Sequence, residues 1–203
     1  MVWYHADLTQ TRERILYAAF MEVHANGFQA ASIQNIINAA GVTKGALYHY
    51  FDSKNAIGHA LVDEVFTQYI DATFVKSLAN TDDPIASLIE SLLAFKDNMT
   101  DADIGLGCPF DSFTSEMAPI DPALRKSVEA LRQNKQITME AAFLRGQAAG
   151  TVSLEVDAHS LALMVCAMMH GCMGIAKSAC SVETLMQYGQ PMIDYLQNLR
   201  LQS

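Results

Sequence analysis

The segment GVTKGALYHYF, residues 41–51, combines two glycines, a lysine, a histidine and three aromatic residues within a short stretch. Placed on a helix at about 100° per residue, it divides into two faces. The inner face, which we expect to be buried, holds Leu47, Tyr50 and Phe51. The outer face holds Lys44, Gly45, Tyr48 and His49. A solvated lysine beside core aromatics is the plainer alternative, but the helical phase favours an outer face that contacts a polar partner.

The residues around this segment form a helix-turn-helix pattern. Ser32 is a candidate cap for a helix over residues 33–40, which carries apolar residues at i, i+3, i+4 and i+7 and ends at Gly41. Thr43 can cap a second helix that is too short to be stable alone, so the first helix and the glycine turn must hold it. In a helix-turn-helix unit, the second helix enters the DNA major groove.

The outer residues have the chemistry that such a helix needs. Lys44 can reach a base acceptor or a phosphate, and the missing Cβ of Gly45 lets the backbone approach DNA closely. Tyr48 and His49 can donate hydrogen bonds to phosphate oxygens, and Tyr48 can also contact a thymine methyl group. The pattern therefore predicts a DNA-reading helix.

Helical periodicity dominates the whole chain, and no segment alternates with period two for long enough to predict a strand. A first helix is expected to begin at Asp7 or Thr9, to end at Gly27 and to bury Ile15, Ala18, Ala19 and Val23. A fourth helix, capped by Asp52 or Ser53, runs from Lys54 towards Leu78. Further helices are predicted over 84–99, 109–117, 122–148, 157–178 and 182–200, with DADIGLG at 101–107 as a break.

Charge is distributed unevenly along the 203 residues, whose formal net charge is -9. Residues 1–54 contain four Lys/Arg and four Asp/Glu, so all of the net charge comes from the remainder. A polyanion can therefore approach only the N-terminal part. We predict two domains, 1–54 and 55–203.

The four cysteines, at 108, 166, 172 and 180, form no CxxC pair, and residues 1–10 lack the order of a secretory signal. We expect unpaired thiols and a cytoplasmic protein. The apolar run at 161–176 contains His170 and is shorter than a bilayer crossing requires, so a buried helix is expected there and no membrane partner.

Three segments, RERILYAAFMEVHANGF, SIQNIINAAGVTKGALYHYF and SKNAIGHAL, resemble the DNA-binding domain of the tetracycline-repressor (TetR) family in unbroken order over about residues 9–62. The resemblance implies an all-α fold, with an N-terminal three-helix DNA-binding domain and a C-terminal helical domain for ligand binding and dimerisation. It implies a homodimeric transcription regulator, usually a repressor, that leaves a palindromic operator when a small-molecule inducer binds. It also assigns 157–178 and 182–200 to the dimer interface.

Carried over residue by residue, the family's DNA contacts fall on Ser32, Thr43, Lys44, Gly45, Tyr48, His49 and Lys54. Ser32 and Lys54 lie at the starts of helices, where backbone amides favour an anion, so together they could clamp the DNA backbone. The start of the first helix, Thr9 to Arg12, is a further candidate phosphate contact. Because the chain lacks a basic N-terminal arm, we expect few ionic contacts to phosphates.

Residues 84–200 contain no GxSxG, HExxH or phosphate-loop motif, so we expect no enzyme and no cofactor. In GLGCPFDSF, Pro109 suits the first position of a helix, which makes Cys108 its N-cap, where amides and the helix dipole favour a thiolate. Some TetR-family repressors with a similar GC respond to electrophiles or oxidants through that cysteine. Cys108 is therefore a candidate sensor, with a small buried residue beside a proline turn as the alternative.

A largely apolar ligand pocket is expected, with the candidate lining Phe66, Tyr69, Phe95, Phe110, Phe113, Phe143 and Met169. Cys166 and His170 lie four residues apart, but two ligands make a weak metal site, and none is predicted. Two alternatives remain. One is a small-molecule or lipid-binding protein of the same fold without specific DNA binding, which the zero net charge of residues 1–54 supports; the other is a small all-α enzyme.

Overall fold

A computed structural model describes residues 6–201 of the chain, without the side chains of residues 73 and 74. Within this range the regular elements are helices, and one isolated antiparallel bridge pairs Val152 with Arg200. The prediction of an all-α fold is confirmed. The α-helices are α1 (Thr11–Asn26), α2 (Ile33–Ala40), α3 (Lys44–Tyr50), α4 (Lys54–Ala60), α5 (Thr67–Ile70), α6 (Lys76–Ala79), α7 (Pro84–Asp97), α8 (Asp101–Leu106), α9 (Pro109–Met117), α10 (Pro122–Ala149), α11 (Ala158–Ala179) and α12 (Val182–Leu199), with π-helical segments η1 (Leu61–Phe66) and η2 (Asp71–Val75).

The described chain divides into two compact units. The head unit contains residues 6–69 and 109–130, and the body unit contains residues 70–108 and 131–201. The helix α9 therefore belongs to the same unit as α1 to α4, although 39 residues of the body unit, 70–108, lie between the two parts of the head unit in the sequence. The proposed domains 1–54 and 55–203 remain a prediction.

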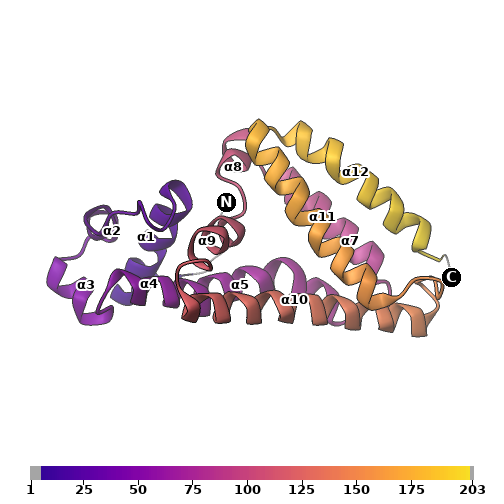
Figure 1. Cartoon of the computed structure of the whole chain (residues 1–203), viewed down its shortest axis with the longest axis horizontal. Coiled ribbons are helices and arrows are strands. Elements are labelled where there is room, and N and C mark those ends of the chain that lie inside the picture. Colours follow the sequence, from indigo (N-terminus) through magenta and orange to yellow (C-terminus); the bar gives the residue numbers. More distant parts are fainter. Residues whose placement is uncertain (1–5, 202–203) are drawn as a thin grey trace. The chain divides into compact units, whose positions relative to one another are not determined.

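The head unit is built around α1, which packs against α2, α3, α4, η1 and α9 (Figure 1). The predicted apolar stripe of this helix is buried, as expected from its spacing: Ile15, Ala18, Ala19 and Val23. The start differs from the prediction, because α1 begins at Thr11 after Gln10. The Asp7 carboxylate instead accepts hydrogen bonds from the N–H and hydroxyl of Thr9, at 3.0 and 2.6 Å, and fixes a turn before the helix.

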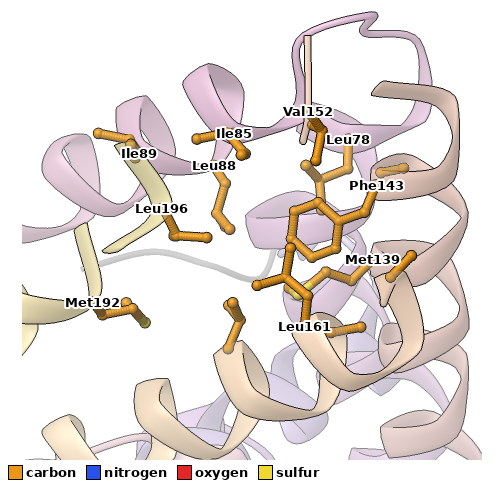
Figure 2. Close-up of a cluster of buried hydrophobic side chains, with 14 of the residues drawn as sticks. Leu78, Ile85, Leu88, Ile89, Met139, Phe143, Val152, Leu161, Met192 and Leu196 are labelled. Atoms are coloured by element: carbon orange, nitrogen blue, oxygen red, sulfur yellow. The ribbon is translucent and has the colours of Figure 1, made fainter. Parts of the chain in front are cut away.

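The core of the body unit is drawn mainly from α7, α10, α11 and α12, with Leu78 of α6 and Val152 after α10 (Figure 2). Phe143 of α10 is fully buried in this core, whose other labelled members include Leu78, Leu88, Leu161 and Leu196. The helix α11 packs against α12 and α8, and α12 packs against α7. Burial of these large side chains is the main favourable contribution to the stability of the unit.

The segment DADIGLG, predicted as a break, forms the short helix α8, so that prediction was wrong. Thr100 Oγ1 accepts a hydrogen bond from the Asp103 N–H at 3.2 Å, and the Asp103 carboxylate accepts one from the Thr100 N–H at 3.0 Å. This reciprocal capping box satisfies two N–H groups at the start of the helix. Burial of Ile104 against the body unit supplies the remaining support.

The fourth predicted helix begins at Lys54 and is capped by Ser53, whose Oγ accepts the Ala56 N–H at 3.1 Å. It continues to Ala79, but η1 and η2 interrupt its α-helical geometry. Such π-helical segments are uncommon in proteins. The first of them, η1, carries Glu64, which binds an arginine of α1 as described below.

The helix α11 confirms the prediction of a helix over 157–178 to within one residue at each end, and it contains the whole apolar run at 161–176. Among the described residues it is the one helix long and apolar enough to cross a bilayer, a test that the core helix of a globular protein also passes. The expected burial holds for one side of the helix in the single chain. Leu161, Val165, Met173 and Ala176 are buried, whereas the opposite side is exposed.

Candidate DNA-binding site

Local hydrogen bonds fix the two helices of the helix-turn-helix. Ser32 Oγ accepts the Asn35 N–H at 3.3 Å at the start of α2, and Thr43 Oγ1 accepts the Ala46 N–H at 3.1 Å at the start of α3. Gly41 ends α2 with a φ of 64°, a left-handed conformation that favours glycine. These three predictions are confirmed. Each hydroxyl accepts a hydrogen bond through its oxygen, so its proton can be donated to another acceptor.

The outer face of α3 has the composition expected from the sequence. Lys44, Gly45, Tyr48 and His49 are exposed, whereas Leu47 and Phe51 are buried. The Lys44 ammonium lies 5.9 Å from the centroid of the Tyr48 ring, close enough for a cation–π contact. The structure thus brings a cation, a bare backbone and two polar rings together on one surface of a two-turn helix.

Tyr50 does not lie in the core, and the prediction that placed it there was wrong. Its side chain is 42% exposed, and its ring packs edge-on against His49 with centroids 5.1 Å apart. The helix ends at Tyr50, and the next residue, Phe51, adopts an extended backbone with φ −139° and ψ 108°. Phe51 is 3% exposed and fills the core position, so Tyr50 remains at the surface.

Two arginines of α1 bind groups of the head unit itself. Both terminal nitrogens of Arg12 donate to the Glu64 carboxylate, at 2.7 and 2.6 Å, and its guanidinium lies 5.1 Å from the centroid of the Phe51 ring. Arg14 Nε donates to the Ala40 carbonyl at 3.3 Å. Arg12, a candidate phosphate contact, is therefore already paired with a carboxylate. Its guanidinium is less available to bind a DNA phosphate.

Lys54, the second predicted clamp, holds the loop between α1 and α2. Its ammonium donates to the carbonyls of Gln29 and Ala31, at 2.9 and 2.6 Å, and lies 5.3 Å from the centroid of the Phe28 ring. A lysine has three N–H donors, so two of them are used inside the head unit and one is left for a phosphate. Ser32, whose Oγ caps α2, follows this loop directly.

The candidate pocket residues divide between the two units. Phe66, Tyr69, Phe110 and Phe113 lie in the head unit, and Phe95, Cys108, Phe143 and Met169 lie in the body unit. In the head unit, the Phe66 ring packs against Phe110 and Phe113, with centroids 5.8 and 5.3 Å apart. In the body unit, Phe143 is a core residue and Met169 packs beside the same core.

Cys108 is half-buried and directly precedes Pro109, the first residue of α9, as predicted. The preceding Gly107 has a φ of 77°, and a Cβ there would lie 2.6 Å from Cδ of Lys177. The aliphatic part of the Lys177 side chain thus covers the backbone at Gly107, next to Cys108. Sequence reasoning missed this lysine, because 69 residues separate it from the cysteine and no local motif links them.

Cys166 and His170 are both half-buried on α11. The Nδ1 atom of His170 lies 2.6 Å from the Cys166 carbonyl oxygen, one helical turn earlier. Burial raises the pKa of the Cys166 thiol, against the opposing effect of Lys135 and Arg132. Over the described part of the chain, no three His, Cys, Asp or Glu side chains are grouped so that they could hold a metal ion.

One side of α11 is exposed and carries no charged residue. In order around the helix it consists of Leu163, Gly174, Ala167, Ser160, Ser178, Gly171, Met164 and Ile175, all exposed except the half-buried Met164. We call this set the α11 stripe. Leu163 and Ile175 are each 41% exposed, and no atom lies within 4 Å of a Cβ placed on Gly171 or Gly174. Contiguous exposed apolar surface of this kind is typical of protein–protein contacts.

Comparison with known proteins identifies both parts of the chain. Residues 15–61 match the model for bacterial regulatory proteins of the tetR family, and residues 84–187 match the tetracyclin repressor-like C-terminal domain. The second match alone covers half of the chain.

Individual relatives agree with these matches. An uncharacterized HTH-type transcriptional regulator from Lactococcus lactis is 28% identical over 130 residues, which are 64% of this chain and 66% of the relative. The HTH-type transcriptional repressor DhaR of Mycobacterium sp. is 23% identical over 163 residues, 80% of each chain. A TetR transcriptional regulator from Chloroflexus aurantiacus has a similar solved structure, with TM-score 0.81, 25% identity and coverage of 96% of this chain and 98% of that one. The chain therefore belongs to the TetR family of DNA-binding transcriptional regulators.

Proposed function

We propose that the protein is a homodimeric repressor that binds a palindromic operator through α3 and leaves it when a signal reaches the body unit. The observation that carries the proposal is the outer face of α3, where Lys44, Gly45 and Tyr48 are exposed on a helix fixed by the Thr43 cap. The name of DhaR as a repressor supports this mode of action. Such a protein acts on DNA in the cytoplasm and needs no catalytic group.

The proposed DNA contacts are Ser32, Thr43, Lys44, Gly45, Tyr48, His49 and Lys54. We assign the base contacts to the residues of α3, because the second helix of a helix-turn-helix lies in the major groove. We assign the phosphate contacts to Ser32, Thr43 and Lys54, which lie at helix starts. The predicted domain boundary at residue 55 would place all seven contacts in the first domain.

A titration with DNA from immediately upstream of the protein's own reading frame, followed by fluorescence anisotropy, tests the proposal. With excess unrelated DNA present, the wild-type protein should bind saturably, and Tyr48→Ala should lower the affinity by about tenfold, because a contact to DNA worth about 1–3 kcal/mol is lost. Tyr48 is 40% exposed, so the fold should be unchanged. Absence of specific binding at this and neighbouring promoters would instead favour a ligand-binding protein that has kept only the fold.

The second copy in the proposed dimer packs against the α11 stripe and the neighbouring exposed face of α12. Regulators of this family dimerise, and the stripe is uncharged, partly apolar and open in the single chain. Tyr188 and Tyr195 of α12 are 48% and 41% exposed. Aromatic residues are enriched in the cores of such interfaces.

The signal in this proposal is either a largely apolar small molecule or modification of Cys108. Two features support the cysteine: its position directly before the N-terminus of α9 and the cationic Lys177 side chain beside Gly107. The aromatic and methionine residues predicted as a pocket lining remain candidates for small-molecule binding.

Replacing Cys108 by serine should abolish release of DNA by hydrogen peroxide, while leaving affinity for DNA within about twofold of wild type. Peroxide oxidises a single thiolate to a sulfenic acid and is itself reduced to water, and the nearly isosteric serine cannot undergo this step. The measurement is anisotropy of the preformed protein–DNA complex before and after peroxide. Cys172→Ser is the matched control, since the Cys172 thiol is buried and should be protected from peroxide. Release that persists in Cys108→Ser would rule out this cysteine as the sensor.

A further inference from the structure

The loop between α1 and α2 is held by a carboxylate from a distant part of the chain. Glu116 of α9 accepts two backbone hydrogen bonds, from the Phe28 N–H to Oε2 at 2.7 Å and from the Gln29 N–H to Oε1 at 2.6 Å. Each oxygen thus serves one amide, and bonds from N–H groups to an ionised acceptor are stronger than neutral ones. Nothing in the local sequence marks Glu116, which is 87 residues from Gln29.

The backbone of this loop is shaped to receive the carboxylate. Gly27 has a φ of 81°, a conformation that side-chain-bearing residues rarely adopt, and a Cβ there would lie 3.0 Å from Glu116 Oε2. Glycine followed by two amides that point at one group forms a concave anion site. The approach of Glu116 therefore depends on the glycine as well as on the amides.

Groups from α4 and α1 complete the support of the loop. On its carbonyl side, Lys54 binds Gln29 and Ala31 as described above. At its end, Glu22 Oε1 accepts the N–H of Ser32, the N-cap of α2, at 3.0 Å. The position of α2 is consequently tied to α1, α4 and α9 through one short loop.

The helix α9 contacts the loop through a second residue. The Phe113 ring packs edge-on against Phe28, with centroids 5.3 Å apart, and Phe28 itself is 3% exposed. Phe113 and Glu116 lie three residues apart, on one side of α9. A displacement of α9 would therefore act on Phe28 through both the ring contact and the hydrogen bond to its N–H.

We propose that Glu116 is a positioning residue for DNA binding, through which α9 fixes the loop before α2 and, with it, the DNA-reading helix α3. Since α9 begins at the residue after Cys108, the same contact would carry a change at Cys108 to the helix-turn-helix. This second step rests on the proposed function; the positioning role does not require a thiol signal.

The first test is Glu116→Gln in the full-length protein. Glutamine has nearly the same shape, but its amide group presents N–H donors to one of the two N–H groups, so one hydrogen bond is lost and the charge is removed. Hydrogen exchange of the peptide that contains Phe28 and Gln29 should accelerate at least tenfold. Affinity for the best sequence selected by the wild-type protein from a random DNA library should fall about tenfold, with little change for unrelated DNA.

Asp63→Asn is the matched control, because it removes one exposed carboxylate from the same unit and should alter neither quantity. Unchanged exchange in Glu116→Gln would overturn the proposal, and so would faster exchange with unchanged specific affinity, which would mean a purely structural contact. If the wild-type protein selects no DNA sequence, the proposed function fails, and the exchange measurement alone then decides whether Glu116 holds the loop.

The second test uses N-ethylmaleimide on the wild type, Cys108→Ser and Glu116→Gln. Alkylation should weaken specific DNA binding of the wild type, leave Cys108→Ser unaffected, and have little further effect on Glu116→Gln, whose loop is already released. Equal losses in the wild type and Glu116→Gln would overturn the transmission step, because coupled residues must be non-additive. If alkylation does not change DNA binding of the wild type, the transmission from Cys108 is wrong. The positioning role of Glu116 is then decided by the first test alone.

Discussion

Replacing Gly45 by alanine is expected to stabilise the folded protein and, at the same time, to weaken its specific DNA binding by about tenfold or more. Gly45 lies within α3 and is exposed, and the nearest atom to a Cβ there would be Thr43 Oγ1 at 3.9 Å. A methyl group thus meets no steric conflict within the chain. Alanine is favoured over glycine in a helix by about 0.5–1 kcal/mol, so the unfolding free energy should rise.

The loss of DNA affinity follows from the same geometry. The face that carries Gly45 also carries Lys44 and Tyr48, and a helix in the major groove is packed closely against base edges and phosphates. An added methyl group there would hold the backbone away from DNA, although it improves the helix. A glycine that costs stability at an open, exposed helical position is most simply explained by a partner that approaches it.

Urea denaturation and anisotropy on the same preparations measure the two effects. Asn134→Ala is a suitable control, because Asn134 is an exposed residue of α10 in the body unit and its replacement also favours the helix. That variant should gain stability without loss of DNA affinity. If Gly45→Ala binds the selected DNA as tightly as wild type, the backbone at residue 45 does not approach the DNA.

Short-range features of this fold were predictable from the sequence, because their causes lie within a few residues. The caps at Ser32, Thr43 and Ser53 and the turn at Gly41 each depend on one side chain or one backbone conformation. The buried stripe of α1 follows from helical periodicity alone. The wrong prediction of a break at residues 101–107 could have been avoided, since Thr100 and Asp103 have the spacing of a capping box.

Contacts between distant segments could not be predicted in this way. Nothing near Arg12 indicates that it pairs with Glu64, and nothing near Gly27 indicates the carboxylate of Glu116. Both pairs form only after the helices have packed. They also change the interpretation of the site, because Arg12 and Lys54 were predicted as phosphate contacts from the family resemblance and their positions at helix starts, and both have strong internal partners. Helical phase likewise could not show that Phe51 would leave the helix and fill the core in place of Tyr50.

Replacing Gly171 by glutamate is expected to convert the protein to a monomer and to lower its affinity for a palindromic DNA site by about 10²- to 10³-fold. No atom of the chain lies within 4 Å of a Cβ on Gly171, so the single chain should fold normally. In the proposed dimer, however, the new carboxylate would be buried in an uncharged surface, where an unpaired charge is strongly unfavourable. Two linked heads bind a two-part site far more tightly than one head, and this advantage would be lost.

Sedimentation velocity and anisotropy would test this prediction, with Ala148→Glu as the control. Ala148 is exposed near the end of α10, outside the α11 stripe, so the same added charge there should leave both the dimer and DNA binding intact. Gly171→Ala should have an intermediate effect, since a methyl group separates the helices without adding charge. A dimeric Gly171→Glu protein with wild-type DNA affinity would exclude the α11 stripe as the interface. Gly171 resembles Gly45 in this respect: each is an exposed helical glycine at which a Cβ would meet no close contact within the chain, one facing the proposed second copy and the other the DNA.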